Sequence, residues 1–284
     1  MVTRGSFLSV LAAGCAALAC AAPAHGAAVI GSDLATTATA NNGCNLVTCT
    51  TANLTLIGSS QAPAGLTSPV NGTVTSWTMR SGSAGNLISL RVLRPATGAV
   101  TYTGAGTSAP GMTGSAIDGP FQTSLPISIG DSIGLENPSS ATVIGNNGGA
   151  SQVFWNMPPL ADGATRTGTV GAGFEVLVQA VVVPDNAVKL RRIVRNVKKG
   201  IAKVFVDVPN AGSLSFGGKR VKVGKGPTTT AGPATIKLNV KAAGKKAKKL
   251  KRKGKVGVKP VVTFTPTLGE PRSTPIKFAL KRRR

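Results

Sequence analysis

Acidic residues are scarce in the rear part of this 284-residue chain, whereas the front part is nearly balanced. After Val183 the sequence holds 28 Lys and Arg but only three Asp and Glu, a net charge of +25. Residues 27–182 hold four Arg and six acidic residues, a net charge of −2. A charge step of this size indicates two domains, and the basic one is expected to attract polyanions without selecting among them.

Histidine is nearly absent, because His25 is the only one in the chain. It lies at the end of a segment with the layout of a secretory signal peptide, in which Arg4 precedes an apolar run over 7–22 and small residues precede Ala27. We therefore expect residues 1–26 to be removed on export. The remaining chain would then have no imidazole for a catalytic triad, a metal site or a proton shuttle.

Cysteine is also rare, and two of the four cysteines, Cys15 and Cys20, fall in this leading segment. Since both follow small residues, a lipoprotein stays open as an alternative to cleavage after residue 26. An uncleaved membrane anchor, formed by the apolar run, is a second alternative. The other two, Cys44 and Cys49, are separated by four residues and are predicted to form a disulfide in an exported protein. Its short loop makes it worth about 2 kcal/mol. Two thiolates are too few for a metal site, and we expect neither metal nor cofactor.

Aromatic residues make up only 4% of the chain, with two Trp and one Tyr. Sugar-binding faces commonly stack exposed aromatic rings on pyranose rings, so Trp77 and Trp155 are the first residues to consider for such a role. Trp77 lies within a strand pattern and is expected in a sandwich core. Trp155 precedes a loop, so both a core position and an exposed sugar-stacking position stay open for it.

Carboxylates are few in the front part, and they are its only candidates for acid–base catalysis: Asp118, Asp131, Glu136, Asp162 and Glu175. A glycoside hydrolase needs two facing carboxylates at a defined separation, which sequence spacing does not establish. All three of these Asp residues adjoin Gly in turn-like sequences, where Asp bonds its own backbone. No calcium-loop pattern is present. We therefore predict no catalytic centre, and we keep a polysaccharide-active hydrolase as an alternative.

What the chain has in abundance is Gly and Pro, 36 and 18 residues, placed in clusters between short β-branched runs. This pattern predicts an all-β protein, with front-part strands expected at 54–57, 74–79, 87–93, 127–133, 153–155 and 174–183. In the run at 87–93, Ile88, Leu90 and Val92 are expected to face the core, with Ser89 and Arg91 toward water. Residues 28–183 are predicted to form a jelly-roll-like sandwich, with a closed barrel as the main rival. Residues 187–284 show period-2 apolar stripes, one of them over 256–264, and predict about six strands of an immunoglobulin-like or fibronectin-like sandwich.

The densest basic cluster lies between two of the predicted rear strands. Its cations are Lys245, Lys246, Lys248, Lys249, Lys251, Arg252, Lys253 and Lys255. Only Ala247 and Leu250 are apolar there, so we expect a solvated loop with at most one helical turn. A solvated loop of no further role and a polyanion site both stay open, and cations at 191–199 and 281–284 support the polyanion site because they add to the same field. Anionic cell-wall polymers or an acidic membrane surface are the expected partners. Specific nucleic-acid recognition is not expected, because no aromatic ring or reading helix accompanies the cations.

Two sets of motifs carry a resemblance to known proteins. The front set comprises IGSDL, the Cys44 and Cys49 loop, SPVNGTVTSWTMR, LISLRVLRP and PISIGDSIGLEN. The rear set comprises RNVKKGIAKV, VPNAGSLSF, the run from Leu250 to Gly254, and VTFTPTLGEP. With these motifs the chain resembles uncharacterised two-domain secreted proteins of high-GC Gram-positive actinobacteria. The resemblance implies export, a front β-sandwich and an extracellular rear module, and no catalytic residue; Ile201 and Phe205 replace the smaller or polar residues expected to face outward there.

We therefore expect a secreted protein associated with the cell envelope. Its rear domain would attach to anionic polymers, and no reaction would be catalysed. A carbohydrate-binding jelly roll is the alternative, and a polysaccharide-active hydrolase is the weaker one.

Overall fold

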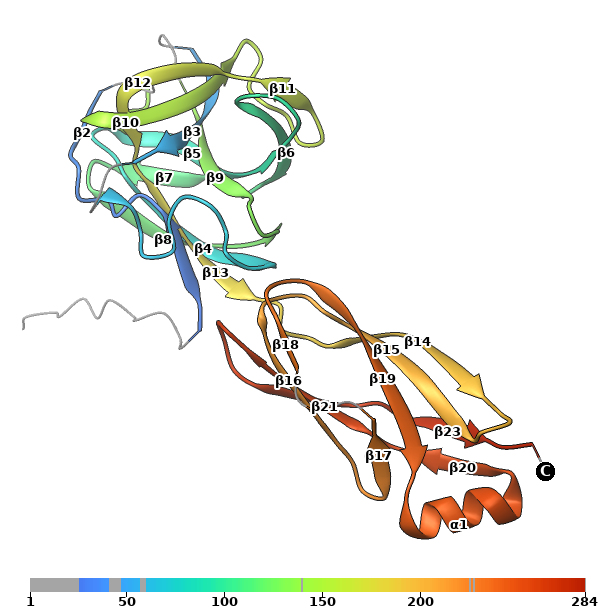
Figure 1. Ribbon diagram of the computed structural model, residues 1–284. Coiled ribbons are helices and arrows are strands. Elements are labelled where there is room, and N and C mark those ends of the chain that lie inside the picture. Colours follow the sequence, from blue (N-terminus) through green and yellow to red (C-terminus); the bar gives the residue numbers. More distant parts are fainter. Residues whose placement is uncertain are drawn as a thin grey trace, which may run out of the picture.

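The computed structural model describes residues 26–40, 47–56, 60–138, 140–224, 226 and 228–283. Apart from one helix, the regular elements of these residues are antiparallel strands, so the predicted all-β fold is confirmed. Figure 1 shows two bodies joined end to end, the first ending with strand β13 (Val178–Pro184) and the second starting with β14 (Lys189–Asn196). Within the described part, no helix is long and apolar enough to cross a membrane.

The first body is a sandwich of two sheets. The smaller sheet consists, in spatial order, of β1 (Ala28–Gly31), β13, β4 (Gly72–Arg80) and β8 (Ile117–Ile127). The larger sheet consists, in spatial order, of β11 (Thr165–Thr167), β6 (Thr101–Thr107), β5 (Ala84–Pro95), β9 (Ser132–Asn137), β3 (Cys49–Thr55), β10 (Ile144–Asn156) and β12 (Thr169–Val176). Two short strands flank it, β2 (Ala38–Ala40) beside β10 and β7 (Gly111–Gly114) beside β5.

The strand order of the first body is that of a jelly roll. The first and last strands, β1 and β13, are neighbours, and β9 returns late in the chain to lie between β3 and β5. The order β1-β13-β4-β8 opposite β3-β9-β5-β6 is the double Greek key, to which β10, β11 and β12 are added. No pairing joins the two sheets among the described strands, so the structure is an open sandwich rather than a closed barrel.

Apolar residues fill two layers in the jelly roll. Between the sheets, Ile88, Leu90 and Val92 of β5 are fully buried, as the alternation along this strand predicts. A second, smaller cluster covers the outer face of the larger sheet, where the segment between β10 and β11 folds back over it. Its buried members are Ala52, Leu93, Val153, Trp155 and Leu160. This second layer buries a face of β5 that the sequence pattern assigned to water.

Two of the expected front strands are divided. The run 127–133 is split because β8 ends at Ile127 and β9 begins at Ser132, with a turn between them in which Gly130 has a φ of 86°. A side chain at that φ is strained, so glycine suits the turn. The run 174–183 is split at Leu177, where the chain leaves β12 in one sheet for β13 in the other. A period-2 pattern continues across such a change of sheet, so it does not reveal the break.

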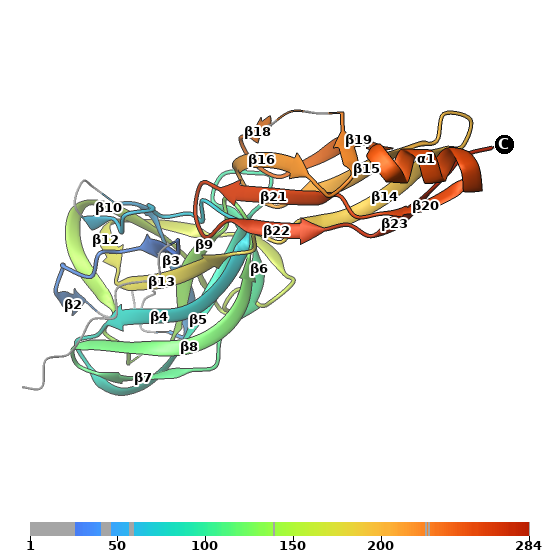
Figure 2. The same cartoon turned by 90° about the horizontal axis from the view of Figure 1, so that it is seen from below.

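The second body is an immunoglobulin-like sandwich. One sheet consists, in spatial order, of β14, β15 (Ile201–Val208), β19 (Ala234–Ala242) and β17 (Val221–Val223). The other consists of β18 (Thr228–Thr230), β16 (Gly212–Gly217), β21 (Val261–Pro266) and β22 (Arg272–Pro275), with a hairpin of β20 (Lys255–Val258) and β23 (Phe278–Lys281) beyond it. These orders match the ABED and CFG sheets of a constant-type immunoglobulin domain, with β18 added beside β16. Figure 2 shows the two sheets from below.

The last two strands of this sandwich are interrupted, which the apolar pattern did not indicate. The stripe at 256–264 is divided into β20 and β21 by Lys259 and Pro260. Proline has no N–H to donate to a ladder, so strand pairing stops there. Ile276 and Lys277 divide β22 from β23 at the matching place. The described part of this body therefore has ten short strands where about six were expected.

Asparagine side chains fasten the two bodies together. Asn210 is only 1% exposed, and its Oδ1 accepts the backbone N–H of Asn71 at 2.7 Å. Its Nδ2 donates to the carbonyl oxygens of Asn71 and Asp185 at 3.1 and 2.9 Å. Nδ2 of Asn186 donates to the carbonyl oxygen of Leu268 at 2.9 Å, and Leu268 packs against the jelly-roll core. These bonds hold the junction in one arrangement.

Replacing Asn210 with alanine is expected to loosen this junction. The substitution leaves the part-buried N–H of Asn71 without its acceptor, which costs about 1–3 kcal/mol. We expect a lower free energy of unfolding and a broader distribution of distances between spin labels placed on the two bodies. Asn239→Ala, the same substitution within β19, serves as the control and should change neither. An unchanged distance distribution in Asn210→Ala would show that other contacts fix the junction.

Candidate functional site

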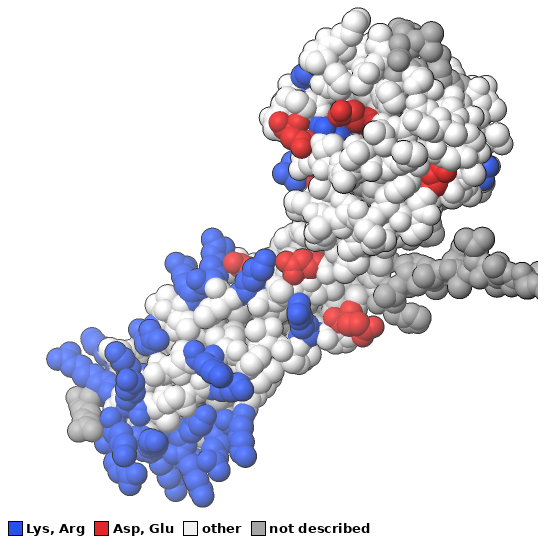
Figure 3. Space-filling model, turned by 180° about the vertical axis from the view of Figure 1, so that it is seen from behind, with Lys and Arg blue, Asp and Glu red and all other residues white. Residues whose placement is uncertain are grey.

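Lys and Arg gather at the end of the second body that lies away from the jelly roll, as Figure 3 shows. Three segments meet there: the turn 197–200 between β14 and β15, helix α1 (Gly244–Lys253) and residues 281–283. Backbone hydrogen bonds join them, since the N–H of Arg282 donates to the carbonyl oxygen of Gly254 at 2.8 Å and the N–H of Arg283 donates to that of Val197 at 2.8 Å. We call these three segments the basic tip.

The basic tip collects cations from distant parts of the chain. The predicted cluster supplies Lys245 to Lys253 on α1, and Lys255 follows in β20. Further cations border the hollows around the tip: Lys198, Lys199, Lys241, Lys281, Arg282 and Arg283. Among the described residues, no carboxylate forms an ion pair with any of these cations. Of the three acidic residues in this body, Asp185 and Asp207 each pair with a cation of β14, and Figure 3 shows the acidic side chains toward the jelly roll.

Helix α1 corrects the expectation of a loop with at most one helical turn. It has ten residues, and Leu250 anchors it by packing, 5% exposed, in the core of the sandwich. Lys and Arg are good helix formers, and those in the last turn face the negative end of the helix dipole. Gly254 ends the helix with a φ of 67°, and its N–H donates to the carbonyl oxygen of Leu250 at 2.9 Å. The burial of Leu250, the helix propensity of Lys and Arg, and the capping at Gly254 together outweigh the repulsion among the lysines.

The exposed face of α1 is uniformly cationic. Lys245, Lys248, Lys249 and Arg252 lie at spacings of three and four residues, so they stand side by side on that face, and all are exposed. The first turn of the helix carries no acidic residue. Like charges at these spacings destabilise a helix by about 0.2–0.5 kcal/mol per pair. A polyanion lying along this face would relieve that repulsion as it binds.

Both tryptophans are buried, which corrects the sugar-stacking expectation for Trp155. Trp155 is 2% exposed and Trp77 is 1% exposed. Nε1 of Trp155 donates to the carbonyl oxygen of Arg166 at 3.2 Å. The rings of Trp155 and Tyr102 pack edge to face, with 5.6 Å between their centroids. Burial of Tyr102 raises the pKa of its hydroxyl. Trp155 therefore fills the outer apolar layer of the jelly roll and offers no ring face to a sugar.

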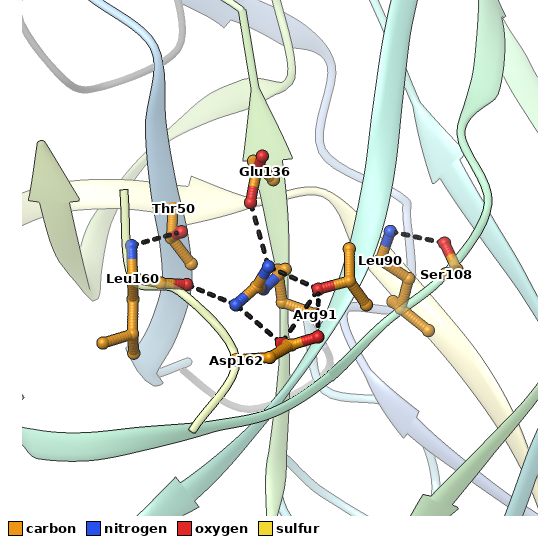
Figure 4. Close-up of polar contacts among 8 residues, drawn as sticks. Thr50, Leu90, Arg91, Ser108, Glu136, Leu160 and Asp162 are labelled. Atoms are coloured by element: carbon orange, nitrogen blue, oxygen red, sulfur yellow. Dashed lines mark hydrogen bonds and ion pairs between the residues drawn. The ribbon is translucent and has the colours of Figure 1, made fainter. Parts of the chain in front are cut away.

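Arg91 is buried rather than turned toward water, and it draws two carboxylates together (Figure 4). Its Nη1 lies 3.0 Å from Oε2 of Glu136, and its Nη2 lies 2.9 Å from Oδ1 of Asp162. The guanidinium also donates to the Thr107 hydroxyl and to the carbonyl oxygen of Leu160. The two carboxylates therefore share a cation, which is an arrangement suited to holding the segment around Leu160 against the sheet.

The other candidate carboxylates lie apart from this pair. Asp131 is 2% exposed and binds Arg94, with 2.9 Å between Oδ2 and Nη2; this contact raises the pKa of Arg94. Glu175 is fully buried and accepts hydrogen bonds from Ser32 and Thr36 at 2.5 and 2.7 Å. Asp118 accepts hydrogen bonds from the Ser81 hydroxyl and the backbone N–H of Gly114. Each of these three carboxylates is occupied by hydrogen bonds or an ion pair that connect it to other segments of the jelly roll.

Several predictions fall on residues outside the described ranges. They concern the leading segment 1–25, with Cys15 and Cys20, and the partner cysteine Cys44. Cys49 itself is fully buried at the start of β3. The signal peptide and the disulfide therefore stay predictions. In the described part, no group of three or more His, Cys, Asp and Glu residues is placed to hold a metal ion.

Comparison with known proteins finds no match to a protein-family model, to a curated protein or to a solved structure. The resemblance to secreted actinobacterial proteins therefore stays an expectation.

Proposed function

We propose that this protein is a secreted, non-catalytic binding protein of the cell envelope whose basic tip attaches to anionic polymers or acidic surfaces. The observation that carries the proposal is the separation of charge within the second body. Many of its described cations gather at the basic tip, where no described carboxylate forms an ion pair with them, whereas Asp185 and Asp207 pair with cations near the other end. The positive charge of the tip is therefore not neutralised by ion pairs within the described part of the protein, and it is free to attract an anionic partner.

The physical scale of the attraction supports attachment. Each lysine near an anionic surface is worth about 1 kcal/mol, and release of counterions adds a term that grows with the number of contacts. The tip presents these charges on a rigid base, because strands and α1 both anchor in the sandwich core through residues such as Leu250 and Leu280. Export, through the predicted signal peptide 1–26, would bring the tip to wall polymers and lipid headgroups. The predicted disulfide between Cys44 and Cys49 belongs to the same setting.

A salt titration tests the proposal. The full chain is titrated with linear polyphosphate at increasing salt, and the association constant is measured at each concentration. We expect the logarithm of the constant to fall linearly with the logarithm of the salt concentration, with a slope of about −0.7 to −0.9 for each cation engaged. Dextran, a neutral polymer, serves as the control and should not bind. Binding that is indifferent to salt, or no binding in dilute buffer, would overturn the proposal.

A further inference from the structure

Two exposed aliphatic side chains lie in or next to the basic tip: Val197 belongs to its turn, and Val194 lies in β14 just before that turn and lines one hollow together with Val197 and Lys198. Val194 and Val197 are 48% and 42% exposed. Val194 lies opposite Lys203 in the β14–β15 ladder, on the outer face of the sheet. Val197 begins the turn of the tip and borders the hollow that Lys253 and Lys281 also line. Single exposed valines are ordinary on protein surfaces. What sets these two apart is that they lie beside unpaired cations, so a partner with both anionic groups and an apolar layer would contact both kinds of side chain.

A hollow beside the turn repeats this combination. It has a volume of about 160 Å³, and its apolar lining includes Ile201, Ala247 and Leu250. Cations stand around it: Lys199, Lys241, Lys251 and Arg282. Ile201 is one of the two outward residues that departed from the sequence expectation. The other, Phe205, lies farther along β15 and is covered by the guanidinium of Arg192, 4.4 Å from the ring centroid.

We propose that the basic tip docks on the surface of an anionic lipid membrane, with Val194 and Val197 entering the headgroup layer. The inference rests on the proposed function and names one partner for the same tip. A soluble polyphosphate engages the cations alone and gains nothing from exposed valines. An anionic bilayer engages both, because its headgroups attract the lysines while its interfacial layer accepts the apolar side chains.

The placement of these residues suits a flat partner. The turn, α1 and the last described residues form the end of an elongated body, as Figures 1 and 2 show. Long lysine side chains can reach headgroup phosphates while their aliphatic stems lie along the apolar surface. The jelly roll lies at the opposite end and leaves this approach open.

Paired binding measurements test the inference with the full chain. The probes are vesicles of phosphatidylcholine mixed with phosphatidylglycerol, and linear polyphosphate in solution. Replacing both residues, Val194→Ser and Val197→Ser, should weaken vesicle binding about tenfold and leave polyphosphate binding unchanged. The matched control is Val170→Ser with Val183→Ser, since these valines are 53% and 45% exposed outside the tip. The control should bind both probes as the unaltered chain does, and circular dichroism confirms that both variants fold.

The outcomes separate this inference from the proposed function. Vesicle binding that is equal in the Val194 and Val197 variant and in the unaltered chain overturns membrane entry. Binding of polyphosphate without binding of vesicles also overturns it, and leaves a soluble anionic polymer as the partner of the tip. Failure to bind either probe in dilute buffer overturns both proposals.

Discussion

Replacing Lys248, Lys249 and Arg252 with glutamine lowers the affinity of the full chain for polyphosphate or anionic vesicles about a hundredfold in dilute buffer. All three residues are exposed on the same helix, α1. At about 1 kcal/mol for each cation near an anionic surface, their loss removes about 3 kcal/mol of binding free energy. Glutamine keeps the helix propensity of lysine, and removing like charges at spacings of three and four residues favours the helix. The loss therefore reports charge rather than unfolding.

A charge-matched control decides whether position matters. Lys189, Arg191 and Arg272 are exposed cations outside the basic tip, and replacing all three with glutamine removes the same net charge. At about 0.1 M salt we expect this variant to lose less than about tenfold, because screening confines the attraction between exposed charges to about 10 Å, whereas in dilute buffer the two losses should come closer together. Binding is measured by isothermal titration calorimetry at two salt concentrations. Equal losses in the two variants would show that the whole domain, and not its tip, carries the affinity.

Removing both acidic partners of Arg91 destabilises the jelly roll by about 3 kcal/mol. In the double variant Glu136→Gln and Asp162→Asn, the guanidinium stays buried, with its side chain 5% exposed, but has no counter-charge. This loss of unfolding free energy lies at the lower end of the range for a broken buried ion pair, because the side chains of Glu136 and Asp162 are 36% and 52% exposed and therefore partly screened by water. The free energy of unfolding is measured by chemical denaturation.

A third substitution tests the reason for this loss. Adding Arg91→Met removes the buried cation and should restore most of the lost stability, because an apolar side chain suits the same space. Lys189→Gln breaks the exposed pair with Asp185 and should cost less than about 1 kcal/mol. If the double variant is as stable as Lys189→Gln, the ion triad does not hold this part of the jelly roll together. If Arg91→Met adds to the loss, the guanidinium stabilises through its other hydrogen bonds.

The sequence was a good guide to local elements and a poorer one to what covers them. Alternation along β5 correctly predicted that Ile88, Leu90 and Val92 face the core, because side-chain direction follows from strand geometry alone. The same alternation wrongly predicted that the side chain of Arg91 is exposed to solvent. Its burial depends on Leu160 and Asp162, which lie far along the chain and fold back over the sheet. No local pattern carries that information.

The candidate site shows the same division. The cluster from Lys245 to Lys255 is evident in the sequence, but its helical form depends on Leu250 packing into a core built by distant strands. The sequence leaves both a core and a surface position open for Trp155, because its burial requires the outer apolar layer on the larger sheet, which residues distant in the chain build. The exposure of Val194 and Val197 was likewise outside the reach of the pattern. An apolar residue on an edge strand is expected inward until the fold shows which face is covered.

The junction built by Asn210 has a consequence for what the jelly roll can meet. Because hydrogen bonds to Asn71 and Asp185 fix the angle between the bodies, a molecule held by its far end carries the jelly roll at a constant height and tilt above the surface. If the basic tip is bound as proposed, the second body would hold the jelly roll in one orientation relative to that surface. Copies of the protein attached to the same anionic surface would then all present the same side of the jelly roll to molecules approaching from solution.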